Sequence, residues 1–227
     1  MSFEERSYSG RIFRPTPEVH IEEDASFGII ATPWGNRSAA RKVIDTLKDY
    51  VLSARQDSEA TSPFQKLTCL SPTANTLRAG LMLANDLIYR EDNKSEYTAG
   101  VEVVVFAKSD QELAYAHVGH PNSFLARPGL PWIPLTCQID LSSELSSSDN
   151  ILSPLPLNLL GLHMTTNLNV ASIRLQPEDR IIFLSHSHIS QSLASMPQMK
   201  PSLPAISEKL ARQYPELPFW LGIYALP

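Results

Sequence analysis

Cysteine is scarce in this sequence, with two residues among 227. Cys69 and Cys137 lie in separate apolar contexts without CxxC spacing, which excludes a disulfide framework or a thiolate zinc site and leaves packing as their expected role. Long apolar runs are also lacking: no stretch approaches the roughly 20 residues that span a bilayer, and the N-terminus has no apolar secretory segment. These absences predict a soluble, cytoplasmic protein.

Positive charge is not in excess either. The net charge is −5, and the Lys and Arg residues are dispersed, so no basic stripe is available for a nucleic-acid backbone. The sequence has no internal repeat and no GxSxG motif, which argues against a repeat architecture and a serine hydrolase. An apolar content of 43% is enough for one sizeable core, so we expect a single domain over residues 1–227.

Apolar periodicity predicts an α+β domain rather than alternating βαβ units. A strand over 26–31 is expected to end in a tight loop at Thr32-Pro33-Trp34-Gly35-Asn36, because proline and glycine interrupt strands. Apolar residues at three- and four-residue spacing predict helices over 39–51, with Ser38 as a cap, and over 77–88. Residues 141–154 are serine-rich and predict an exposed loop. The remaining predictions are a hairpin over 101–118, strands over 123–126, 171–175, 181–184 and 219–226, and a helix over 202–213.

Three segments resemble landmarks of the type 2C, or PPM, metal-dependent protein phosphatases, and they occur in the order that this family has. They are FGIIATPWGN (27–36), AHVGHPNSFLARPG (116–129) and LQPEDRIIFLSHS (175–187). Ala84-Asn85 and Gly100-Val101-Glu102 stand where the family has a helical AN segment and a GTT strand. The resemblance covers about residues 9–226. It implies a four-layer α-β-β-α sandwich of two antiparallel sheets flanked by helix pairs.

The resemblance also implies a lost metal site. The family hydrolyses phosphoserine and phosphothreonine with water held between two Mg²⁺ or Mn²⁺ ions, which carboxylates bind. Three of the metal-binding aspartates correspond here to Thr32, His120 and His186, which are neutral at pH 7. We therefore expect no Mg²⁺ or Mn²⁺ and no phosphatase activity. Glu18 and Glu216 match two further acidic positions only loosely, so a metal-binding role for either stays open.

The expected function is that of a pseudophosphatase, a protein-binding scaffold or regulator. Its partner is expected to be a protein, with a phosphoprotein or a kinase-pathway component as one option, and its oligomeric state is left open. Arg14 matches the family arginine that grips phosphate, which suits a guanidinium fork. The candidate residues for binding a partner or a phosphate are Arg14, Trp34, Asn36, His120, His186 and His188.

Three alternatives remain open. A phosphopeptide reader would use Arg14 with His120 and His186, whereas an enzyme with a remodelled site would bind Zn²⁺ through His120, His186 and His188. A purely structural module would recruit its partner through an exposed apolar patch around Trp34, Trp132 or Trp220. Residues 136–160 take the place of a flap that faces the substrate in many family members, and this segment is short here.

Overall fold

The computed structural model describes residues 2–56, 64–147, 150–188 and 202–225. Its contacts divide the chain into two compact units, each built from separate stretches of sequence. Unit 1 comprises Met1–Thr16, His120–Leu157 and Gln176–Pro227, and unit 2 comprises Pro17–Gly119 and Asn158–Leu175. Each unit has its own sheet and its own core. The single domain expected from the sequence stays a prediction.

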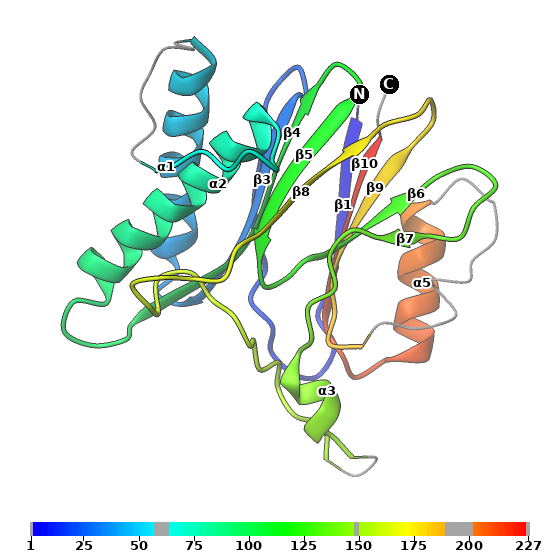
Figure 1. Ribbon diagram of the computed structural model, residues 1–227. Helices are drawn as coiled ribbons and strands as arrows, with labels where there is room; N and C mark the ends of the chain where they lie inside the picture. The colour runs from blue at the N-terminus through cyan, green and yellow to red at the C-terminus, as the bar shows by residue number, and fades with distance from the viewer. Residues whose placement is uncertain (1, 57–63, 148–149, 189–201, 226–227) are drawn as a thin grey trace. The chain divides into compact units, whose positions relative to one another are not determined.

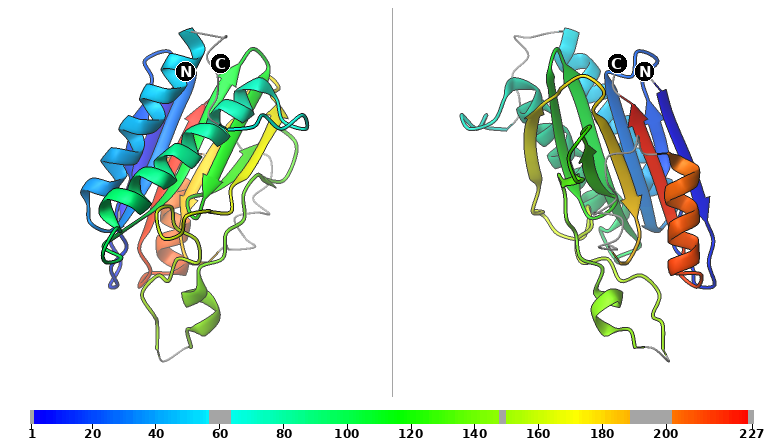
Figure 2. Two further views of the ribbon diagram at one scale, coloured as in Figure 1. Left: turned by 60° about the vertical axis from the view of Figure 1, so that its left-hand side comes forward. Right: turned by 90° about the vertical axis from the view of Figure 1, so that its right-hand side faces the viewer.

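Unit 2 is a five-stranded antiparallel sheet in the order β2-β3-β4-β5-β8. Two helices, α1 and α2, pack against each other and against one face of this sheet (Figures 1 and 2). Their apolar faces and the facing strand residues form one continuous core, as the helical periodicity predicts. The elements are β2 (Glu18–Ile21), β3 (Phe27–Gly35), α1 (Ser38–Gln56), α2 (Pro72–Leu87), a π-helical turn η1 (Ile88–Asp92), β4 (Ala99–Ser109), β5 (Glu112–Val118) and β8 (Asn169–Arg174).

Strand β3 is longer than predicted, because it continues through Thr32 and Pro33 to Gly35 instead of ending at Thr32. Its neighbour β2 pairs only with residues 28–31 of β3, whereas β4 pairs with β3 as far as Gly35. Beyond Ala31, β3 therefore has a ladder partner on one side only. A proline without an N–H is tolerated where one side of a strand has no ladder partner, so Pro33 does not interrupt the strand.

Unit 1 is a second five-stranded antiparallel sheet, in the order β1-β10-β9-β6-β7. Helix α5 packs against β1 and β10, and its apolar face joins the core of the sheet (Figure 1). The elements are β1 (Ser2–Tyr8), β6 (Asn122–Ala126), β7 (Ile133–Pro134), α3 (Leu141–Leu145), β9 (Arg180–Ser185), α5 (Leu203–Gln213) and β10 (Phe219–Ala225). The predicted serine-rich loop therefore contains a short helix, and α5 begins after an N-cap at Ser202. Residues 189–201, which precede α5, lie outside the described residues.

The packing role expected for the two cysteines is wrong, and the structure also bears on the alternative of an exposed tryptophan patch. Cys69 and Cys137 are exposed rather than packed in the interior, because both lie outside the regular elements. Trp132 and Trp220 are buried in the core of unit 1, so neither contributes an exposed apolar patch. Among the described residues, no helix has the length and apolar character that a bilayer crossing requires.

Candidate functional site

A buried ion pair between Arg14 and Asp140 is the central polar feature of unit 1. The guanidinium Nη2 of Arg14 lies 2.6 Å from Oδ2 of Asp140, and the two side chains are 3% and 1% exposed. Ser187 donates its hydroxyl to the same carboxylate oxygen at 2.7 Å. Arg14 lies in the loop after β1, Asp140 precedes α3, and Ser187 follows β9. The pair thus ties together three stretches that are distant in sequence.

The second oxygen of the Asp140 carboxylate is also fully engaged. Oδ1 accepts hydrogen bonds from the backbone and hydroxyl of Ser142, at 3.0 and 2.7 Å, and from the backbone N–H of Leu155 at 2.8 Å. Burial alone would raise the pKa of Asp140, but the hydrogen bonds from Leu155, Ser142 and Ser187 and the charge of Arg14 outweigh it and lower that pKa. Asp140 is therefore a stable carboxylate at neutral pH, and it neutralises the cation that the resemblance assigns to phosphate binding.

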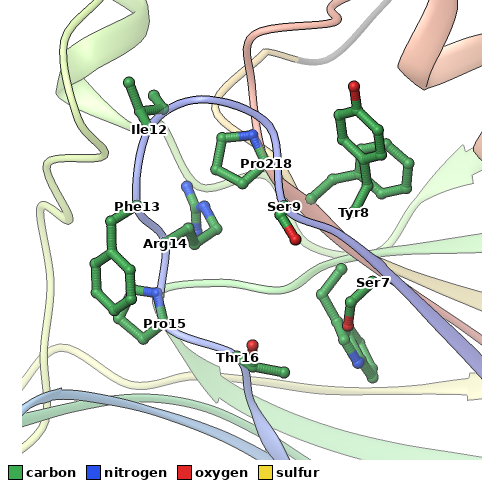
Figure 3. Close-up of a pocket in the computed structure, with 11 residues that line it drawn as sticks. Ser7, Tyr8, Ser9, Ile12, Phe13, Arg14, Pro15, Thr16 and Pro218 are labelled. Carbon is green, nitrogen blue, oxygen red and sulfur yellow. The ribbon is translucent and has the colours of Figure 1, made fainter.

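A pocket of about 210 Å³ lies beside this pair, between the loop after β1 and the start of β10. Figure 3 shows Ile12, Phe13, Arg14 and Pro15 on one curved loop that faces Pro218. Phe13 is 69% exposed, so the rim of the pocket is apolar. Because the Arg14 side chain is buried and paired with Asp140, the pocket does not offer an open cation to a phosphate group.

The histidines that follow β9 are grouped around one aromatic ring. The ring centroids of His186 and His188 lie 5.0 and 5.5 Å from that of Tyr214, and His188 stacks on it at an interplanar angle of 10°. Nδ1 of His186 lies 2.5 Å from the carbonyl oxygen of His188 and 3.1 Å from the backbone N of the same residue, so it donates to the first or accepts from the second according to the tautomer of the ring. Nε2 of His186 is buried without a hydrogen-bond partner among the described residues.

His186 is neutral at physiological pH. Burial lowers the pKa of His186 to about 4, and electrostatic interactions with Arg14, His188 and His120 lower it further. The hydrogen bond with His188 acts in the opposite direction and is outweighed. His120 is also buried, at 2% exposure. The structure therefore places Arg14, His120, His186 and His188 in one unit, where all of them except the half-buried His188 are buried.

Thr32 and Trp34, two further candidate positions, belong to unit 2. Thr32 is fully buried in β3, and its hydroxyl makes no hydrogen bond to any residue that the structure describes. It lies opposite Glu102 of β4 in the ladder, and Glu102 is a buried carboxylate whose Oε2 accepts a hydrogen bond from the Trp34 indole at 3.0 Å. The Glu102 side chain packs directly against Gly119, whose φ is +70°. A Cβ added at Gly119 would lie 2.6 Å from Cγ of Glu102, so any larger residue would clash with this acid. Trp34 thus supports a buried acid instead of standing free on the surface.

The other predicted residues have local structural contacts. Asn36 is exposed and accepts hydrogen bonds from the backbone and hydroxyl of Ser38, so it organises the start of α1, a role that the sequence assigned to Ser38. Glu18 lies in β2 opposite Ala31 of β3. Glu216 forms an ion pair with Arg11 at 3.1 Å.

These donors do not suit a pair of Mg²⁺ or Mn²⁺ ions, which require several charged or carbonyl oxygens. Thr32 and His186 contribute a hydroxyl and a neutral imidazole, and Asp140 is already neutralised by Arg14. Over the described ranges of the chain, no three His, Cys, Asp or Glu residues are grouped in a way that would hold a metal ion.

Sequence reasoning missed Asp140 and Glu102, although each has a recognisable signal. Asp140 precedes Leu-Ser-Ser-Glu, a pattern typical of a helix N-cap, and it caps α3 by accepting from the Ser142 backbone. Glu102 is a lone acid in a run of β-branched residues, where an ionisable side chain requires a polar partner.

Comparison with known proteins reveals similarity in structure only. No protein-family model matches the chain, and no curated protein matches its sequence. Among solved structures, the PPM Ser-Thr phosphatase MsPP from Mycobacterium smegmatis has a TM-score of 0.67 at 15% identity, over 100% of this chain and 99% of that chain. The catalytic domain of the phosphatase PstP, solved with two manganese ions, has a TM-score of 0.63 at 17% identity, over 100% and 98%. PppA, described as a key regulatory component of T6SS in Pseudomonas aeruginosa, has a TM-score of 0.62 at 15% identity, over 100% and 99%.

Each match extends over the whole chain, and the two antiparallel sheets with their helices are the elements that the matched fold shares. The predicted α+β fold class is thereby confirmed. At sequence identities this low, the structural similarity establishes the fold but not the activity. The chain has the fold of the PPM-type serine/threonine phosphatases.

Proposed function

We propose that this chain is a catalytically inactive relative of the PPM-type phosphatases that acts as a protein-binding scaffold or regulator. The observation that carries the proposal is the chemistry of the positions matched to metal-binding aspartates. Thr32 and His186 are buried and uncharged there, and His186 has a pKa of about 4. A neutral group cannot replace a carboxylate in balancing a doubly charged ion.

The size of the deficit follows from Coulomb's law. One unit charge at about 4 Å from another contributes roughly 4 kcal/mol at an effective dielectric near 20, and about 1.4 kcal/mol is a tenfold change in affinity. Three carboxylates replaced by neutral groups therefore remove many orders of magnitude of Mg²⁺ or Mn²⁺ affinity. A hydrolytic step that needs both ions would have no measurable rate.

The Arg14–Asp140 pair argues against the phosphopeptide-reader alternative. A phosphate would have to compete with a carboxylate that accepts five hydrogen bonds within its own unit. We expect phosphorylation of a bound peptide to leave its affinity unchanged within about twofold, which is below ~0.5 kcal/mol.

One observation favours a second candidate, an enzyme with zinc at the histidines. Nε2 of His186 is buried without a partner among the described residues, and a neutral imidazole is a good Zn²⁺ ligand. His188 is the next histidine in the chain, but its ring stacks on Tyr214. Zinc binding would therefore require His188 to leave that stack.

The test is metal binding and turnover measured on the same preparation. Calorimetric titration with Mn²⁺, Mg²⁺ and Zn²⁺ is combined with an assay on a phosphopeptide, with an active PPM phosphatase as the positive control. We expect neither stoichiometric metal nor turnover. The triple variant Thr32→Asp, His120→Asp, His186→Asp restores the acidic positions and is expected to gain Mn²⁺ binding. Turnover by the natural chain that requires a metal and disappears in His120→Ala would refute the proposal.

A further inference from the structure

Exposed apolar side chains are concentrated in one part of unit 1, the chain from Ile139 to Leu157, which we call the 139–157 arm. Its described residues are 139–147 and 150–157. Figures 1 and 2 show α3 and the chain around it extending away from the β1-β10-β9-β6-β7 sheet. Half of the large apolar side chains that the described residues expose lie here: Ile139 (54%), Leu141 (38%), Leu145 (64%), Ile151 (39%), Leu155 (41%) and Leu157 (55%). A concentration of this kind marks an interaction surface more often than a neutral one.

The base of the arm is held in a defined conformation. The Asp140 carboxylate joins the outgoing chain to the returning chain through the N–H of Leu155, and to the body of unit 1 through Arg14 and Ser187. The Leu141 N–H donates to the Leu155 carbonyl at 3.1 Å, next to a bridge between Asp140 and Pro156. The apolar side chains are therefore presented by an anchored base, which lowers the entropy that binding must remove.

The charge of the arm selects the kind of partner. Between residues 139 and 157 the sequence has three acidic residues, Asp140, Glu144 and Asp149, and no Lys or Arg. Asp140 is neutralised by Arg14, while Glu144 is exposed in α3 between Leu141 and Leu145. An acidic apolar surface without basic residues is repelled by anionic lipid headgroups and matches a groove with a basic rim.

We propose that the 139–157 arm is the docking surface of this chain for a partner protein with an apolar groove rimmed by Lys or Arg. Leu145 and Leu157, the two most exposed aliphatic side chains of the arm, enter the groove, and Glu144 pairs with the rim. This inference deepens the scaffold function proposed above and rests on it. It assigns the binding surface to a segment that carries none of the positions matched to metal ligands.

The experiment uses the full chain with a photo-crosslinking residue in place of Leu145, and a second version with it in place of Tyr97. Tyr97 lies in unit 2, is 72% exposed and is a matched apolar control outside the arm. The protein cross-linked through position 145 in the native cells is identified and purified. Its Kd is then measured for the natural chain, for Leu145→Ser combined with Leu157→Ser, for Glu144→Lys and for Tyr97→Ser.

We expect the double leucine variant to bind the purified partner at least about tenfold more weakly, as for central apolar contacts, and Tyr97→Ser to bind unchanged. Glu144→Lys is expected to weaken binding several-fold at low salt, with the difference shrinking as salt screens the rim. Circular dichroism of each variant checks that the fold is retained.

The other outcomes overturn the inference in distinguishable ways. Cross-linking of position 145 only to a second copy of this chain, or binding of the chain to phosphatidylserine vesicles that the leucine variant abolishes, would assign the arm another role. A partner that binds all variants with equal affinity would show that the arm is not the docking surface, but it would leave the proposed scaffold function intact. The absence of any cross-linked partner from either position would count against both proposals, and metal-dependent turnover would count against the scaffold function by itself.

Discussion

Lowering the pH from about 7.5 to about 5 tests the buried, neutral state of His186. The pKa of His186 is lowered to about 4 by burial, from an ordinary value of 6.5. The unfolded chain therefore binds a proton near pH 6.5, while the folded chain does so only near pH 4. Stability from this group is fully present above about pH 6.5 and is lost as the pH falls toward 4.

The magnitude follows from the two pKa values. Integrating the difference in bound protons from about pH 7.5 to about pH 5 gives a loss of roughly 2 kcal/mol in the free energy of unfolding. No discount for solvent screening applies, because His186 is 1% exposed. For a chain of this length the loss corresponds to a decrease of about 4–8 °C in Tm.

Urea unfolding of the natural chain and of His186→Asn at both pH values provides the measurement. Asparagine places its side-chain amide near the position of Nδ1, where it can donate to the His188 carbonyl or accept from the His188 N–H, while the titrating group is removed. We expect the variant to lose about 2 kcal/mol less stability than the natural chain over this interval. Equal losses in both proteins would show that His186 titrates normally, and the argument for a neutral imidazole would fail.

Two further predictions concern buried contacts. Arg14→Met leaves the Asp140 carboxylate buried without its cation, so the free energy of unfolding should fall by about 3–5 kcal/mol in urea titrations. Adding Asp140→Asn to the same chain should recover part of this loss. Additive effects of the two substitutions in a double-mutant cycle would contradict the pairing. Gly119→Ala adds a Cβ 2.6 Å from Cγ of Glu102 at φ +70° and should lower Tm by more than Gly129→Ala, whose φ is +78° but whose Cβ would meet nothing within 4 Å. Equal shifts for the two glycines would mean that Glu102 moves aside without loss.

The elements with strong apolar periodicity were predictable because their own residues specify them. Helix α2 and the β4–β5 hairpin form where the apolar patterns predict them, and Leu77, Leu81 and Ala84 of the helical pattern are buried. Strand β1 was not predictable, since residues 2–8 are mostly exposed and include Glu4, Glu5 and Arg6. Its conformation depends on pairing with β10, a partner at the opposite end of the sequence.

The candidate site also has features that the sequence predicts and features that it does not. The loss of carboxylates at Thr32 and His186 could be read from the sequence once the family motifs were matched, because residue type alone shows that neither side chain is an acid. The neutral state of His186 could not be read in this way, because it depends on burial. The pairing of Arg14 with Asp140 could not, because 126 positions separate them and no local pattern links an arginine in one loop to an acid in another. The structure places Arg14 in a buried ion pair, which could not be predicted from the sequence.

The pairing of β1 with β10 has a consequence for synthesis on the ribosome. Residues 2–8 emerge from the ribosome long before their hydrogen-bonding partners at 219–225 are translated. Unit 2 needs nothing beyond Leu175, so its sheet can close while the chain is still growing. Strand β1 must therefore wait without its partner until residues 219–225 have been translated, and its charged residues Glu4, Glu5 and Arg6 disfavour premature pairing with other nascent chains during that interval.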